Sequence, residues 1–146
     1  MSDPQAATFE RAKSLFIEGV ALVEAGDPAA AEARFEASLA LLPDRASTLL
    51  NLGTVRLALG RPEQALAALE RSVALDASQP DAWCQQGLAL ARLHRLDDAI
   101  ASFERALALD ATDYSATFSL ARLDLADRKP DVARKRFEAL LATMYA

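Results

Sequence analysis

The chain has 146 residues and a net charge of −5, and 52% of its residues are hydrophobic. Its length and composition are typical of one globular domain that can bury a core of its own. The acidic balance argues against nucleic acid as a partner, and no apolar run approaches the 18 residues that a membrane-spanning helix needs.

The N-terminal segment, residues 1–11, is polar and has no apolar stretch of the kind found in signal peptides. Pro4 follows Ser2 and Asp3, either of which could cap a helix that starts near residue 4. We therefore expect residues 1–11 to extend the first helix or to form a flexible arm. Because Cys84 is the only cysteine, no intramolecular disulfide can form, and we expect a cytoplasmic protein.

A period of 34 residues dominates the rest of the chain. It divides residues 12–146 into four units, and a period of this length is typical of stacked copies of one supersecondary element. The four units are 12–45, 46–79, 80–113 and 114–146. Three positions carry the period most clearly: Ala31, Ala65, Ala99 and Ala133; Gly19, Gly53 and Gly87, with Ala121 in the fourth unit; and Phe35, Leu69, Phe103 and Phe137.

Each unit reads as two amphipathic helices with a break between them. The breaks at Pro28, Pro62 and Pro130 place proline where the second helix would begin, because the first helical position needs no N–H donor. Short polar turns separate the units. The small residues within each unit would lie where the two helices cross at close range, and the large residues would fill the neighbouring space. The breaks are Gly26-Asp27-Pro28, Gly60-Arg61-Pro62, His94-Arg95-Leu96 and Arg128-Lys129-Pro130.

This pattern resembles the tetratricopeptide repeat (TPR) family over residues 12–146. The third unit carries the resemblance best, and Pro43 of the first unit matches the proline near the end of the family's motif. The resemblance implies an all-α solenoid of four helix–turn–helix repeats that forms a right-handed superhelix, as a single TPR domain over residues 1–146. The matching residues of the third unit are Trp83, Gly87, Leu90, Ala99, Phe103, Ala106 and Leu107.

In TPR proteins the first helices of successive repeats line a concave groove, and the resemblance implies which residues would face it here. Several of them are apolar, and an exposed apolar area of this size usually marks a partner site. The alternative is that some of these side chains belong to the core. The candidate groove residues are Phe16, Val20, Leu50, Asn51, Thr54, Leu57, Cys84, Gln85, Leu88, Arg92, Phe118 and Arg122.

Nothing in the sequence favours catalysis, a cofactor or a metal. His94 is the only histidine and has no spaced nucleophile or carboxylate partner, so we interpret it as a turn residue. Cys84 is interpreted as an unreactive thiol. The acidic pair Asp97 and Asp98 opens a helix, where the helix dipole favours negative charge, and no cluster of histidine or cysteine accompanies it.

We therefore expect a non-enzymatic protein–protein interaction module that binds a peptide or amphipathic helix through apolar anchors. The TPR subclass that clamps acidic chaperone C-termini needs basic or amide side chains at positions that here hold Phe16, Val20 and Asp81, which argues against that ligand.

Two other functions stay open. One is a small acidic TPR chaperone of a secretion system. The other is a scaffold that self-associates as a homo-oligomer through the last helix, whose apolar residues Leu141, Met144 and Tyr145 have no polar cap after them. The chain could also be a fragment of a longer protein.

Overall fold

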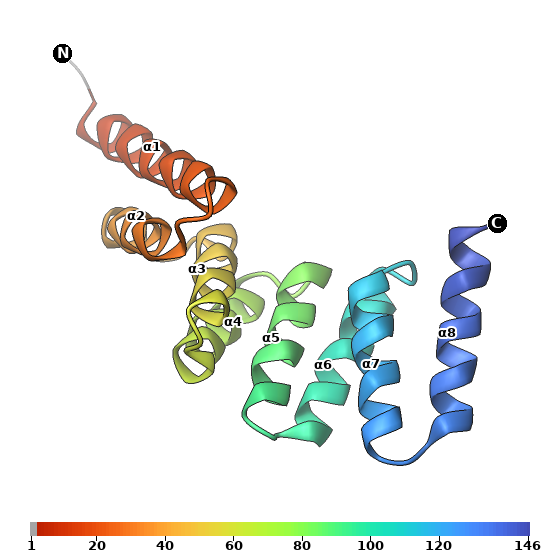
Figure 1. The fold of residues 1–146 in the computed structure, drawn as a ribbon. Helices are drawn as coiled ribbons and strands as arrows, with labels where there is room; N and C mark the ends of the chain where they lie inside the picture. Colours follow the sequence, from red (N-terminus) through yellow and green to blue (C-terminus); the bar gives the residue numbers. More distant parts are fainter. Residues whose placement is uncertain (1–2) are drawn as a thin grey trace. The chain divides into compact units, whose positions relative to one another are not determined.

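A computed structural model describes residues 3–146, and these residues form eight α-helices. The helices follow one another as four hairpins, each with a first and a second helix, as Figure 1 shows. This confirms the predicted all-α tetratricopeptide-like architecture and all four breaks. The helices are α1 (Pro4–Glu24), α2 (Pro28–Leu41), α3 (Ala46–Ala58), α4 (Pro62–Leu75), α5 (Pro80–Arg92), α6 (Leu96–Leu109), α7 (Tyr114–Ala126) and α8 (Pro130–Met144).

The contacts divide the chain into two compact units, one up to Ala77 and one from Ser78 onward. Unit 1 holds helices α1–α4 and unit 2 holds helices α5–α8. In each unit the two helices of a hairpin pack together, and the second helix of the first hairpin packs on the first helix of the next. The boundary falls in the turn between the second and third repeats. None of the helices formed by residues 3–146 is long and apolar enough to cross a membrane.

The helix starts follow the local sequence. Proline occupies the start of α1, α2, α4, α5 and α8. The carboxylate of Asp3 accepts a hydrogen bond from the backbone N–H of Gln5 at 2.9 Å, so Asp3 caps α1. The alternative cap, Ser2, lies outside the described residues. Because α1 begins at Pro4, residues 4–11 extend the first helix.

The four turns inside the hairpins share one backbone conformation. Gly26, Gly60, His94 and Arg128 all have positive φ angles, of 78°, 73°, 59° and 57°. Glycine adopts this left-handed conformation without strain, whereas a side chain with a Cβ atom does so at a cost. His94 is thus a turn residue, as predicted, at the position that glycine holds in the first two repeats.

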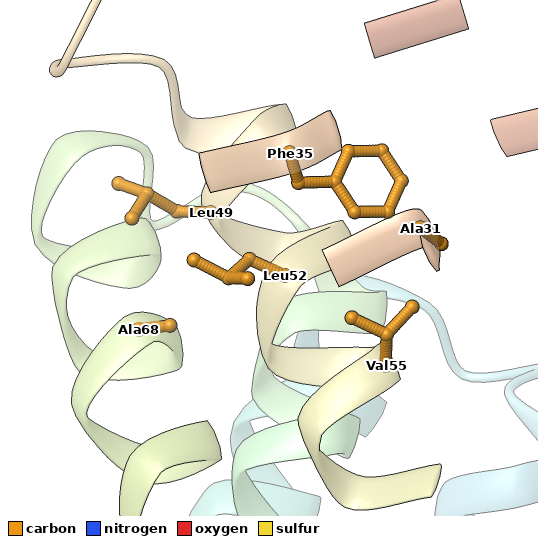
Figure 2. Packing of buried hydrophobic residues seen from close by; sticks show 6 residues of the cluster. All are labelled: Ala31, Phe35, Leu49, Leu52, Val55 and Ala68. Carbon is orange, nitrogen blue, oxygen red and sulfur yellow. The ribbon is translucent and has the colours of Figure 1, made fainter. Parts of the chain in front are cut away.

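The repeated small residues lie where the paired helices touch. Ala31, Ala65, Ala99 and Ala133 are all buried. In unit 1, Ala31 and Phe35 of α2 form a cluster with buried residues of α3 and α4, which Figure 2 shows. The burial of all four alanines is what the predicted helix-contact role requires. The labelled residues in Figure 2 are Ala31, Phe35, Leu49, Leu52, Val55 and Ala68.

Two polar contacts within unit 1 add to this packing. The hydroxyl of Ser38 donates a hydrogen bond to the backbone oxygen of Ala12 at 2.8 Å and so ties α2 to α1. Arg56 of α3 forms ion pairs with Glu32 and Glu36 of α2, at 3.2 Å and 3.0 Å. The repeat pattern predicts only a small residue at position 38, and it does not predict the Arg56 ion pairs.

Candidate partner-binding faces

The first helices of unit 2, α5 and α7, line a pocket of about 460 Å³ that we call the α5–α7 pocket. Its volume lies in the range of roughly 300–1,000 Å³ that is usual for ligand sites. Three of its eight lining residues, Leu88, Arg92 and Arg122, are among the predicted groove residues. The lining residues are Leu88, Ala91, Arg92, Phe103, Ser119, Arg122, Leu123 and Ala126.

The lining combines an apolar wall with two cations. Arg92 of α5 and Arg122 of α7 are both exposed, and the lining includes no carboxylate. An arginine stem can pack along apolar surface while its guanidinium group stays in water. The α5–α7 pocket therefore offers apolar contact beside positive charge.

The carboxylates of the fourth repeat are already paired with other cations. Asp124 accepts from Arg136 at 2.6 Å, and Asp127 pairs with Lys129 at 2.9 Å. Asp131 and Glu138 both pair with Arg134. None of these ion pairs of residues 3–146 includes Arg122, which lines the pocket.

The corresponding helices of unit 1, α1 and α3, line a smaller pocket of about 100 Å³. It lies toward the start of α3, and Lys13, Phe16 and Ser47 are among its lining residues. Phe9 and Arg45 line it too, and the guanidinium carbon of Arg45 lies 5.4 Å from the ring centre of Phe9, a cation–π contact. This pocket therefore lies at other repeat positions than the α5–α7 pocket does.

The predicted groove residues of unit 1 divide between surface and core. Phe16 and Val20 are half-buried and pack against the cluster around Phe35, with the Phe16 and Phe35 ring centres 5.8 Å apart. Leu50 is half-buried too. Leu57 is buried, so it belongs to the core and cannot line an open groove in this structure.

The polar candidates of unit 1 bond to their own helix. The Asn51 amide donates to the backbone oxygen of Ser47 at 2.8 Å, and the Thr54 hydroxyl donates to that of Leu50 at 2.9 Å. Both side chains are half-buried. These two groups therefore have hydrogen-bond partners before any ligand arrives.

Among the candidates of unit 2, Cys84 is buried and belongs to the core, whereas Gln85 and Leu88 are half-buried. The Cys84 thiol lies 3.5 Å from the hydroxyl of Ser115 on α7. Burial raises the pKa of Cys84, the hydrogen bond with Ser115 lowers it, and the charges of Asp113 and Asp81 raise it further. The net effect is a raised pKa, which keeps the thiol protonated and unreactive near neutral pH.

Phe118 is 50% exposed on α7, and its ring centre lies 5.9 Å from that of Phe137 on α8. At the end of α8, Leu141, Met144 and Tyr145 are exposed by 52%, 53% and 81%. These three residues are the predicted self-association surface. Their exposure shows that nothing in residues 3–146 covers them.

The described residues contain no group of three histidine, cysteine or acidic side chains that could hold a metal ion. His94 lies exposed in its turn, and the structure gives it no hydrogen bond from its side chain to another residue of 3–146. These faces combine open apolar area, a few polar groups and two arginines.

Comparisons with known families and structures agree with this architecture. Two family models, both described as tetratricopeptide repeat, match residues 18–78 and residues 50–116. Together these matches extend over parts of all four repeats. No curated protein sequence matches the chain at a significant level.

Several solved structures share the fold. A crystal structure of MamA is 22% identical, with a TM-score of 0.85 over 92% of this chain and 78% of that one. The first TPR of Spaghetti (RPAP3), bound to an HSP90 peptide, is 23% identical with a TM-score of 0.77, over 80% of this chain and 93% of that one. YrrB, described as a TPR protein with an unusual peptide-binding site, is 24% identical with a TM-score of 0.78, over 90% of this chain and 68% of that one.

Proposed function

This chain belongs to the tetratricopeptide repeat family, and on that premise we propose that it is a non-enzymatic module that binds another protein through the first helices of its repeats. The observation that carries the proposal is the α5–α7 pocket, which Leu88 and Ala91 of α5 line together with Leu123 and Ala126 of α7. The ligand would be a peptide or helix with apolar anchors, because burying apolar side chains in a pocket of this kind contributes the most binding free energy.

Two of the similar solved structures are of peptide-binding TPR proteins. They support peptide binding as the class of function, and they do not identify the ligand. RPAP3 is bound to an HSP90 peptide in its structure, and YrrB is described as having a peptide-binding site. We do not propose the HSP90 peptide for this chain, since Phe16, Val20 and Asp81 stand where that TPR subclass needs basic or amide groups. A role as a secretion chaperone would use the same faces and stays a prediction.

A paired set of substitutions tests the proposal. Leu88→Glu and Leu50→Glu each place a charge among apolar side chains of a first helix. Leu109→Glu and Leu75→Glu make the same change at exposed sites at the ends of the second helices α6 and α4. We expect that the Leu88→Glu and Leu50→Glu variants no longer capture the partner from native lysate. The Leu109→Glu and Leu75→Glu variants should still capture it.

Far-UV circular dichroism and thermal unfolding of all four variants provide the folding control. The proposal fails if Leu88→Glu and Leu50→Glu are folded and still capture the same protein as the wild type. It fails equally if the two control variants lose capture while they remain folded.

The exposed end of α8 supports a second candidate function, self-association. Leu39 of the first repeat is half-buried against the core that α2 shares with α3, and Leu141 is the same repeat position in α8. Leu141 is exposed because no helix of residues 3–146 packs there. A second copy of the chain would supply that missing contact.

Pairing of α8 with α8 is favoured over end-to-end stacking of α8 on α1. In α3, the face that packs on the preceding helix carries the buried residues Leu52 and Val55. The same positions in α1 hold Glu18 and Ala21, both exposed, and Glu18 already pairs with Arg34 at 3.1 Å. The outer face of α1 therefore offers an apolar α8 little that is complementary, whereas a two-fold contact would bring like surfaces together.

Light scattering after size-exclusion chromatography tests this second function. We expect the wild type to form dimers as its concentration rises, and Leu141→Glu to remain monomeric. A wild type that is monomeric at every concentration, or a Leu141→Glu variant that still forms dimers, would rule it out.

A further inference from the structure

We propose that the α5–α7 pocket selects partners in which an acidic side chain stands next to an apolar one, and that the same repeat positions of unit 1 make no such selection. This inference rests on the proposed function, because it names the chemistry of the ligand that the same pocket would take. It is carried by the position of the two arginines in the pocket and by a comparison of the two units of this chain.

The pocket places its charge and its apolar area side by side. Arg92 and Arg122 line it together with Leu88, Leu123 and Ala126. A guanidinium group presents several donors in a fixed plane that match the two oxygens of a carboxylate. A peptide with Glu or Asp beside Leu can therefore meet an arginine and an apolar surface in the same pocket.

A carboxylate that contacts Arg122 would come from a partner, because the acids of the fourth repeat are paired with other cations. Asp124, Asp127, Asp131 and Glu138 pair with Arg136, Lys129 and Arg134. No acidic residue lines the pocket. An incoming carboxylate would therefore add a charge-assisted contact to Arg122 without displacing an ion pair of that residue.

The repeat gives an internal comparison for this site. Residues 68 positions earlier occupy the same repeat positions in unit 1, and there the apolar positions stay apolar, as Val20, Val23, Val55 and Ala58. The two arginines are not kept: Glu24 stands in place of Arg92, and Thr54 in place of Arg122. At these repeat positions the apolar character is thus common to both units, whereas the positive charge is present only in unit 2.

These differences change what each face can accept. Glu24 is exposed and carries a negative charge, which would repel an acidic peptide. The Thr54 hydroxyl is engaged with its own helix. A peptide with an acidic side chain would therefore bind at the α5–α7 pocket in preference to the same repeat positions of unit 1.

Two short peptides test the inference by NMR titration of the ¹⁵N-labelled full chain. Acetyl-Leu-Glu-Leu-amide and acetyl-Leu-Gln-Leu-amide differ only in the charge of the central side chain. We expect the Glu peptide to shift amides of α5 and α7 around Leu88 and Ser119. It should bind about threefold to tenfold more tightly than the Gln peptide, as a partly exposed charge-assisted contact would give. The preference should fall with rising salt.

Arg122→Gln should remove the preference for the Glu peptide, because it keeps much of the side-chain stem and deletes the charge. Lys135→Gln is the matched control: it removes the same charge from an exposed position on α8 outside the pocket, so the preference should remain. Both changes keep a good helix former in a helix.

Equal binding of the two peptides, a preference that survives Arg122→Gln, or an absence of shifts in α5 and α7 would each overturn the inference. These outcomes leave the proposed function standing, since that depends on whether Leu88→Glu and Leu50→Glu lose capture of the protein partner. Conversely, folded Leu88→Glu and Leu50→Glu variants that still capture the partner remove the proposed function and this inference together.

Discussion

Gly87 on α5 lies so close to Phe103 on α6 that a methyl group added at Gly87 would come within 2.6 Å of Cε1 of the Phe103 ring. Gly19 has the same relationship with Phe35, at 2.5 Å. The fourth repeat has Ala121 in place of glycine, and there Phe137 is only half-buried, whereas Phe35 and Phe103 are fully buried. In the first and third repeats, where the first helix has glycine at this position, the phenylalanine ring of the second helix is therefore completely buried.

From this close approach we predict that Gly87→Ala destabilises the protein. Overpacking costs about 1–3 kcal/mol, which outweighs the gain of about 1 kcal/mol that alanine brings over glycine inside a helix. Urea unfolding followed by circular dichroism measures the change in the free energy of unfolding.

The double variant Gly87→Ala with Phe103→Ala supplies the control for that prediction. Once the ring is removed, the methyl group introduced at position 87 has room, so the two effects should not add. Additive losses would show that the contact between the two positions is not the cause.

The second prediction concerns the turn of the third repeat. His94 holds a positive φ of 59° at the position that Gly26 and Gly60 occupy in the first two repeats. Relief of this strain outweighs the extra chain entropy that glycine gives the unfolded state, so we expect His94→Gly to raise the free energy of unfolding by about 1 kcal/mol. His94→Ala keeps the Cβ atom and should give no such gain. If the two variants unfold at the same urea concentration, backbone strain at His94 is not significant.

The third prediction concerns Cys84 and pH. Burial raises the pKa of this thiol in the folded protein, so above the unfolded pKa of about 8.5 the unfolded state loses the proton first. The free energy of unfolding of the wild type should therefore fall relative to that of Cys84→Ala as the pH rises above that value. Below that value, the difference between the two free energies should not change with pH. Chemical unfolding at several pH values measures the difference, and a constant difference from about pH 7 to about pH 10 would contradict the account.

Sequence reasoning predicts the hairpins because their determinants are local. Pro28, Pro62 and Pro130 start helices, Gly26 and Gly60 permit the turns, and the 34-residue period repeats these signals in phase. The contact role of the small residues follows from the same period. The single domain expected over residues 1–146 stays a prediction, since the described contacts divide the chain into two compact units.

The burial of individual groove residues cannot be predicted in the same way. Leu57 and Leu125 occupy one repeat position, yet Leu57 is buried and Leu125 is exposed. Cys84 and Phe118 share another position, and there Cys84 is buried and Phe118 is exposed. The repeat position sets which way a side chain leaves its helix, whereas its burial depends on what packs beside it.

The α5–α7 pocket illustrates the same limit. The resemblance places Leu88, Arg92 and Arg122 on one face, but it does not predict that Phe103 of α6 and Leu123 of α7 line the pocket as well. Phe103 packs directly against Gly87, where the missing Cβ atom leaves room for its ring, and this contact exists only when the hairpin is folded.

Photo-crosslinking from a single position tests the central claim most directly. A photoreactive amino acid at position 119, on the wall of the α5–α7 pocket, should crosslink to the protein partner that the wild type captures. The same amino acid at position 109, on the exposed end of α6, should not. Crosslinking from position 109 and not from position 119 would contradict the claim that the partner binds through the first helices of the repeats.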